Sequence, residues 1–233
     1  MSAFDVAALI AQLETIGQEA EEMVARHPVV APWLAGQPDR EQVFAFQAQL
    51  YYQVAATVPL LQACARTCAR LAADDPLYEV LARYYAGQAV EEDQPAPHAE
   101  LLLAGLRRQG FDVDRLPPPC LAVQRFIERG EWAAEHAPLH ELGRAAVLER
   151  AGGRLARRLV GAGAAAGRGP DDFYVVHATA DSAAGGHVDE NTRVLRQLNA
   201  FPAFAAQARD VLAGGEQARA CLLGLLAYAE AHG

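Results

Sequence analysis

Helix-forming residues dominate this chain almost from end to end. Ala, Leu, Arg, Glu and Gln fill most segments, whereas stretches in which β-branched or aromatic residues alternate with polar ones are almost absent. A chain of 233 residues, 52% of them hydrophobic, is long enough to bury a sizeable core and is not generally disordered. The sequence therefore predicts a single all-α domain over residues 1–233, a bundle of seven or eight helices.

Proline, glycine and aspartate mark where these helices are expected to begin and end. Asp39, Asp75-Pro76 and Asp171 are helix start signals, and Pro59 lies inside a continuing apolar pattern, which indicates a kink. Pro117 to Pro119 is the clearest break, but it is too short for a domain linker. The expected helices cover 4–26, 40 to beyond Pro59, 76–92, 98–109, 119–135, 138–166, 171–198 and 202–231, with a glycine-rich turn over 161–169.

Charge and the cysteine pattern limit the classes of partner and site. A net charge of −9 and a pI near 5.2 argue against nucleic acid or an anionic membrane as the main partner. The first residues lack the order of a signal peptide, and no apolar run is long enough for a transmembrane helix. The cysteines lack metal-knuckle spacing, which favours small core residues: Cys64, Cys68, Cys120 and Cys221. We expect a cytoplasmic protein.

His177 and Asp181 are the most informative polar pair of the chain. Four residues apart on a helix, their side chains lie on one face. That helix is expected to continue through Val194, Leu195 and Leu198, so the face points inward. A buried histidine and carboxylate are costly unless they pair with each other or bind a metal.

Two further groups of residues could either pack in the core or bind a metal. Glu149 lies between Ala-Val-Leu and Ala-Gly-Gly, where small residues leave room for an inward carboxylate, although a lone Glu is usually solvated. Glu91 and His98 are seven apart and would share a face of a continuous helix. Pro95 and Pro97 interrupt that helix, and Glu92 is an adjacent alternative to Glu91 as a ligand.

A second pair of histidines has a less specific pattern. His136 and His140 are four apart, next to Glu135 and Glu141, which is compatible with a zinc site. Pro138 lies between the two histidines and disfavours a regular turn. A hydrophilic helix start is therefore the preferred interpretation.

Three segments resemble the ligand helices of the haem-oxygenase-like diiron oxidases. Glu91-x6-His98 with the following Ala-Glu-Leu-Leu-Leu-Ala-Gly is similar to one such helix, Val147-Leu-Glu149-Arg-Ala-Gly-Gly to the next, and His177-x3-Asp181 to the last. The resemblance covers about residues 40 to 200. It implies a haem-oxygenase-like fold in which Glu91 bridges two irons. It also implies that His98 and His177 bind one iron, and that Glu149 and Asp181 bind the other.

The chain departs from that pattern at Ala184, where the family usually has a third histidine. In an undistorted helix His187 would lie on a different face from Asp181. Gly185-Gly186 precedes it, and paired glycines favour a kink that would turn its side chain inward. Asp189 and Glu190 are alternatives. The expected metal ligands are Glu91, His98, Glu149, His177, Asp181 and His187.

The resemblance implies a non-haem diiron oxidase or oxygenase that holds two Fe²⁺ ions and uses O₂. Its substrate would be a small organic molecule such as an amino acid, an amine or a fatty acid. The reaction would be carbon–carbon cleavage, N-oxygenation or desaturation. An external electron donor and a homodimer are compatible with this chemistry, and aromatic candidates for the pocket wall are Tyr51, Tyr52, Tyr84, Tyr85, Phe173 and Tyr174. The alternatives are a metal-free hydrolase or transferase similar to thiaminase II and a non-catalytic helical binding protein.

Overall fold

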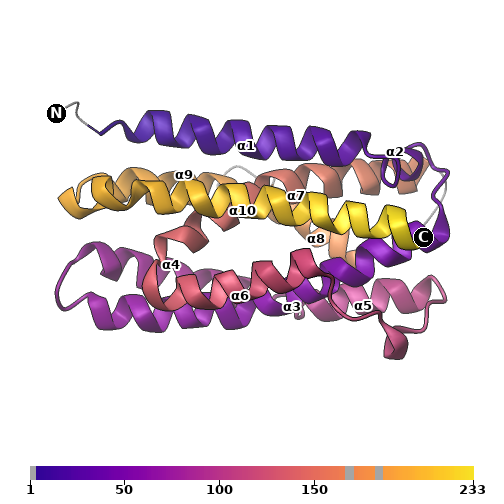
Figure 1. Ribbon diagram of the computed structural model, residues 1–233, viewed down its shortest axis with the longest axis horizontal. Helices are drawn as coiled ribbons and strands as arrows, with labels where there is room; N and C mark the ends of the chain where they lie inside the picture. The colour runs from indigo at the N-terminus through magenta and orange to yellow at the C-terminus, as the bar shows by residue number, and fades with distance from the viewer. Residues whose placement is uncertain (1–3, 166–170, 182–185) are drawn as a thin grey trace.

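The computed structural model describes residues 4–165, 171–181 and 186–233. Within these ranges the chain forms ten α-helices and one short 3-10 helix and no strand, which confirms the all-α prediction. Most helices lie along the long axis of the molecule, with α7 and α10 between α1 on one side and α3 and α6 on the other (Figure 1). The helices are α1 (Val6–Arg26), α2 (Ala31–Leu34), α3 (Arg40–Leu71), α4 (Leu77–Glu91), α5 (His98–Arg108), η1 (Val113–Arg115), α6 (Leu121–His136), α7 (Leu139–Ala165), α8 (Asp172–Ala180), α9 (His187–Leu198) and α10 (Pro202–His232).

Aspartate caps set several of these helix starts, as the sequence predicts. The Asp39 carboxylate accepts hydrogen bonds from the backbone N–H groups of Glu41 and Gln42 at the start of α3. The Asp171 carboxylate accepts one from Phe173 at the start of α8. Pro59 lies inside α3 without ending it. These local signals explain why most predicted boundaries lie within a few residues of those in the structure.

Two expectations for the chain between α7 and α9 are wrong. Helix α7 extends to Ala165, as predicted for the helix over 138–166, so the first part of the turn expected over 161–169 is helical. The helix expected over 171–198 is two helices, because α8 ends at Ala180 and α9 begins at His187. The backbone of Gly186, just before α9, is extended. A residue inside a helix cannot have this conformation, so the helix is interrupted here. Ala184 and Gly185 lie outside the described residues.

Helices α7 and α10 pack unusually closely because glycines face each other. A Cβ atom on Gly143 would lie 1.7 Å from the backbone oxygen of Val211, and one on Gly214 would lie 1.9 Å from that of His140. No larger residue fits either position without separating the helices. This contact fixes α7 at the centre of the bundle.

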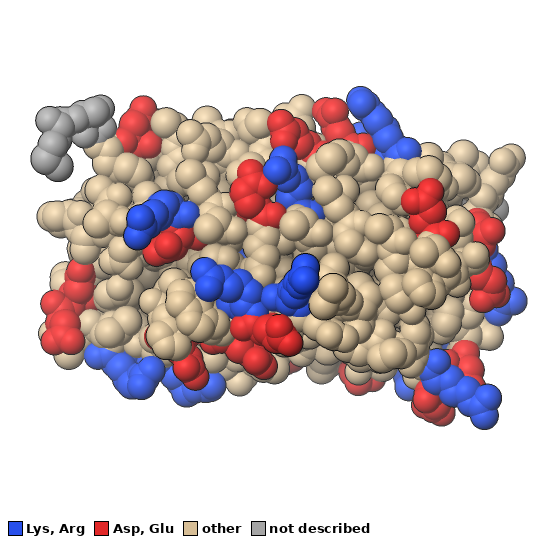
Figure 2. Space-filling view, in the orientation of Figure 1, with Lys and Arg blue, Asp and Glu red and all other residues tan. Residues whose placement is uncertain are grey.

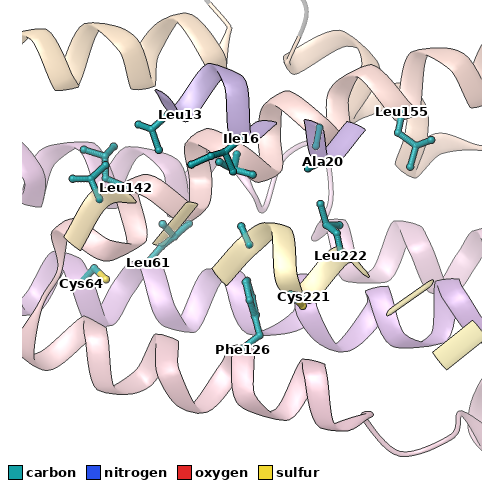
Figure 3. Close-up of a cluster of buried hydrophobic side chains, with 14 of the residues drawn as sticks. Leu13, Ile16, Ala20, Leu61, Cys64, Phe126, Leu142, Leu155, Cys221 and Leu222 are labelled. Atoms are coloured by element: carbon teal, nitrogen blue, oxygen red, sulfur yellow. The ribbon is translucent and has the colours of Figure 1, made fainter. Parts of the chain in front are cut away.

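The core is one continuous apolar cluster around α7 and α10. Figure 3 shows part of it, with side chains from α1, α3, α6, α7 and α10 packed between these helices. Cys64, Cys68 and Cys221 are buried free thiols, and Cys120 is half-buried, which agrees with their interpretation as small core residues. Burial of this cluster provides the main driving force for folding.

The surface carries charges of both signs. On the face in Figure 2, acidic and basic side chains lie beside one another rather than in a patch of one sign. Several form pairs within one helix turn, such as Glu22 with Arg26 and Glu79 with Arg83. No helix of the described residues combines the length and apolar character needed to cross a bilayer.

Candidate metal centre

Four histidine and carboxylate segments that are distant in sequence come together beside α7. The end of α4 and the turn after it contribute Glu91 and Glu92, and the start of α5 contributes His98. The remaining residues lie on α7, at the end of α8 and at the start of α9: Glu149, His177, Asp181 and His187. We call these seven residues the histidine–carboxylate cluster. All six residues predicted from the sequence belong to it, together with Glu92.

The first half of the cluster is formed by Glu92, His98 and His177. Glu92 Oε2 lies 2.8 Å from His98 Nδ1, and the rings of His98 and His177 are in edge-to-face contact at 4.8 Å between centroids. The backbone oxygen of Gln94 lies 3.1 Å from His98 Nε2. Because a turn separates Glu91 from His98, the face expected for a continuous helix does not form. Glu92, not Glu91, contacts His98.

The second half is centred on His187. Its Nδ1 lies 3.0 Å from Asp181 Oδ1 and its Nε2 lies 2.8 Å from Glu91 Oε2. Asp181 Oδ2 is also 3.6 Å from His177 Nδ1, so His177 and Asp181 share a face as their spacing predicts. The break between α8 and α9 turns His187 toward Asp181, which an uninterrupted helix could not do.

Glu149 occupies the α7 side of the cluster. The side-chain amide of Asn191 donates to Glu149 Oε2, and the Asn191 oxygen accepts from the Tyr84 hydroxyl. This chain of hydrogen bonds orients the carboxylate. Sequence reasoning did not identify Asn191, although its position four residues after His187 places both on one face of α9.

Gly153 allows α8 to approach α7 at the cluster. A Cβ atom there would lie 2.3 Å from Asp181 Cβ and 2.9 Å from its Oδ2. The Ala-Gly-Gly segment after Glu149 therefore provides space for a carboxylate, as the sequence indicates, but the carboxylate beside Gly153 is Asp181.

Burial and mutual contacts shift the pKa values of several groups in the cluster. Hydrogen bonding to Asp181 raises the pKa of His187 to about 10 against the opposing effect of burial, so the imidazole is cationic at neutral pH. Burial and the nearby Asp181 carboxylate raise the pKa of Glu149 well above its usual range. Burial would also raise the pKa of Asp181, but hydrogen bonds with His177 and His187 outweigh it and lower that pKa. Several carboxylates thus surround one imidazolium.

An apolar cavity of about 130 Å³ lies beside the cluster. Glu92, Glu149 and His177 contribute to its wall, and most of the remaining wall is aliphatic or aromatic. Phe173 and Tyr174 line it, in agreement with the sequence analysis, and Gln47 donates a hydrogen bond to the Tyr174 hydroxyl. The other four expected aromatic residues are not part of this wall: Tyr51, Tyr52, Tyr84 and Tyr85.

Sequence reasoning missed a second polar group on the cavity wall, Glu141 with Arg144. We predicted a hydrophilic helix start here, and this is wrong, because His140 and Glu141 are buried and Arg144 has no exposed surface. The ion pair has an Arg144–Glu141 distance of 2.7 Å. His136 is exposed and stacks on Trp132 instead of facing His140. Helix α6 covers this segment through Phe126, and α4 and α10 also pack against it, at Pro138 and His140.

The donor set of the histidine–carboxylate cluster suits iron, which accepts imidazole and carboxylate ligands. His177 Nε2 is buried and has no hydrogen-bond partner among the described residues, and the buried Asp181 Oδ2 has only the more distant His177 Nδ1, at 3.6 Å. A bound ion would satisfy such atoms. As they are oriented, no three His, Cys, Asp or Glu side chains of the described ranges surround one ion position. For His187 to bind an ion, one of its ring nitrogens must part from its carboxylate partner, Asp181 or Glu91.

Comparisons with known proteins identify the fold. No protein-family model matches the sequence, and no curated protein matches it significantly. A domain of unknown function with a haem oxygenase-like fold from Shewanella denitrificans superposes with a TM-score of 0.72 at 16% identity, covering 99% of this chain and 92% of that one.

Two further solved structures agree. A TenA homologue from Pyrococcus furiosus has a TM-score of 0.67 at 12% identity and covers 95% of this chain and 99% of its own. A CADD-like protein of unknown function from Nostoc punctiforme has a TM-score of 0.60 at 16% identity, with the same coverage of 95% and 99%. This chain has a haem oxygenase-like fold.

Proposed function

We propose that the protein is a non-haem diiron oxidase or oxygenase that uses O₂ to oxidise a small organic substrate. The observation that carries this proposal is the histidine–carboxylate cluster on the wall of an apolar cavity. Three imidazoles and four carboxylates from five helices and one turn meet there, which is the donor set that two iron ions in a helical bundle need. Ordinary core packing gives no reason for so many ionisable groups in one place.

His98, His177 and Glu92 would hold one ion, and Asp181, Glu149 and His187 the other. Glu92 is the stronger candidate of the two adjacent glutamates, because its side chain is 14% exposed and lines the cavity, whereas that of Glu91 is 49% exposed. Glu91 is then a partner of His187 at the edge of the cluster. Asn191 and Tyr84 fix the orientation of Glu149 in either state.

Bound ferrous ions would supply the electrons for the reduction of O₂. The chain itself positions the ligands, and its apolar cavity holds the substrate beside them and limits access of water. Phe173 packs against the His177 ring at 4.6 Å between centroids and restricts its rotation. A rigid imidazole next to a dry cavity is suited to oxidation of an apolar carbon or nitrogen centre.

The metal-free alternative, a hydrolase with a cysteine nucleophile, has less support. Such an enzyme needs an accessible thiolate. Burial raises the pKa of the Cys68 and Cys221 thiols to about 12, and that of Cys64 still higher. None of the four cysteines lines the cavity.

Anaerobic reconstitution with ferrous iron tests the proposal. We expect about two irons per chain and an O₂-dependent optical transient. Glu92→Gln should lower the iron content more than Glu91→Gln, an otherwise identical substitution one residue away. Iron content at the level of a buffer blank in the wild-type protein would refute the proposal, and equal losses in the two variants would refute the preference for Glu92.

A further inference from the structure

The Glu141–Arg144 pair is a second polar feature of the cavity, separate from the histidine–carboxylate cluster. Glu141, Arg144, Leu148 and Glu149 all contribute to the cavity wall from one face of α7. With a rise of about 1.5 Å per residue, Arg144 lies roughly 8 Å along the helix from Glu149. A ligand that contacts Arg144 can therefore extend along the cavity toward the cluster.

The surroundings of Arg144 are apolar. Its guanidinium carbon lies 3.5 Å from the centroid of the Phe126 ring, and a Cβ atom on Gly130 would lie 2.2 Å from its Nη1 and 2.9 Å from a methyl group of Leu60. Leu61 and Leu222, labelled with Phe126 in Figure 3, line the same cavity. The absence of a side chain at Gly130 makes room for this guanidinium.

One donor of this guanidinium is unused. Arg144 Nη1 donates to Glu141 Oε2, but the Nε–H of Arg144 is buried and has no acceptor among the described residues. A buried donor without an acceptor is unfavourable, and a ligand in the cavity can supply the missing acceptor. Stability alone does not explain a buried ion pair, because apolar residues of similar size would serve as well.

We propose that Arg144, balanced by Glu141, recognises an uncharged hydrogen-bond acceptor at the end of a small apolar ligand. The identification of this ligand as the substrate rests on the proposed function. The chemical class is that of a short-chain amide, ester, ketone or alcohol.

The charge balance selects this class. Glu141 and Arg144 together are formally neutral, and outside the histidine–carboxylate cluster no other described residue of the cavity wall is charged. A carboxylate ligand would leave one uncompensated negative charge in this environment, and an ammonium ligand one positive charge, both of which are costly to bury. An uncharged acceptor satisfies Arg144 without adding charge.

The cavity volume limits ligand size. A dry protein cavity of about 150 Å³ holds a benzene ring. The 130 Å³ cavity is slightly smaller and should therefore hold an apolar group of roughly five or six non-hydrogen atoms. The alkyl chain of hexanamide has five carbons and ends in a carbonyl acceptor that can reach Arg144. Hexanoate and hexylammonium match its shape with a negative and a positive charge.

Saturation-transfer NMR titrations on the metal-free protein test the proposal. At pH 7 we expect hexanamide to bind at least about tenfold more tightly than hexanoate or hexylammonium. Toluene, which needs no polar partner, reports whether the cavity is intact. Hexanoate or hexylammonium binding as tightly as hexanamide would overturn the assignment of an uncharged end group.

The double variant Glu141→Leu with Arg144→Met removes the pair without leaving a lone buried charge. We expect it to bind hexanamide at least about fivefold more weakly and toluene at least as tightly as the wild type. The matched control replaces the surface pair of the same spacing, Glu216→Leu with Arg219→Met, and should change neither affinity. Unchanged hexanamide binding in the first double variant would overturn the proposal.

The iron measurement separates the two proposals. If the protein binds iron but the double variant retains its affinity for hexanamide, the recognition site is wrong and the oxidase proposal stands. If hexanamide binding depends on Arg144 but no iron binds, the recognition site stands and the oxidase proposal is wrong.

Discussion

The two polar regions along the cavity face of α7 are built in different ways. Glu141 and Arg144 are three residues apart on one helix and form a pair that is neutral as a unit. The histidine–carboxylate cluster takes its residues from α4, α5, α7, α8, α9 and the turn after α4, and its buried His177 Nε2 has no hydrogen-bond partner among the described residues. The charges of a local pair can balance within one helix turn, whereas the cluster brings together three imidazoles and four carboxylates from distant segments. This difference underlies our proposals of a recognition group at the pair and a metal site at the cluster.

Removal of a cluster carboxylate should have the largest effect. Asp181→Ala should reduce iron from about two per chain to the level of a buffer blank, because Asp181 contacts both His177 and His187. The helical circular dichroism signal should change little. Iron per chain by atomic absorption is the measurement, and Asp172→Ala, an exposed position on the same helix, is the control. Full iron loading of the Asp181 variant would show that the cluster is not the metal site.

Breaking the α7 pair should affect stability instead of iron. Arg144→Ala should lower the free energy of unfolding by about 3–5 kcal/mol, because it leaves the Glu141 carboxylate buried without a partner. The Glu141→Leu, Arg144→Met double variant should be as stable as the wild type or more stable. Urea unfolding of both variants measures this. Equal destabilisation by the single and the double change would mean that packing, not charge, holds this region.

The cluster should make the metal-free protein sensitive to alkaline pH. The pKa of His187 is raised from an unfolded value of about 6.5 to about 10 in the folded protein. The folded state therefore binds more protons in this interval, so the stabilisation is complete below pH 6.5 and is lost as pH rises through 10. Urea unfolding from pH 6.5 to 10 should show a decline that is smaller in His187→Gln. Parallel pH profiles for the two proteins would contradict the ion pairs of His187.

The α7 region should show a smaller pH effect of the opposite sign. Burial first, and then the positive charges of Arg144 and Arg129, lower the pKa of His140 to about 4. The unfolded state then binds more protons between pH 4 and 6.5, so the stability due to neutral His140 is lost as pH falls through this interval. From pH 7 to 5 the wild type should lose about 1–2 kcal/mol more than His140→Leu. His136→Leu, at an exposed position, should follow the wild type.

The sequence predicts the fold better than the site. Helix propensity, aspartate caps and proline positions act locally, so the all-α bundle and most helix boundaries follow from them. The separation of α8 from α9 was not expected, because the apolar pattern continues across it and only Gly185-Gly186 indicates a break. That break determines the position of His187.

Residue types alone also identify most of the cluster, because histidines and carboxylates with helical spacing are few in this chain. They do not distinguish Glu91 from Glu92, since the choice depends on how the turn after α4 directs each side chain. They also do not identify Asn191. Its contact with Glu149 joins α9 to α7, and the two residues are 42 positions apart in the sequence.

The amino-acid sequence by itself determined that this chain forms helices, where most of them begin, and which residues can bind a metal, because these properties depend on residue type and on neighbours within about four positions. The tertiary structure alone decided that Glu141 and Arg144 are buried. Their local sequence is that of a solvated helix start, and they lose contact with water because α6 and α10 pack against this part of α7. Burial depends on which segments meet in space, and short-range patterns in a sequence do not contain that information.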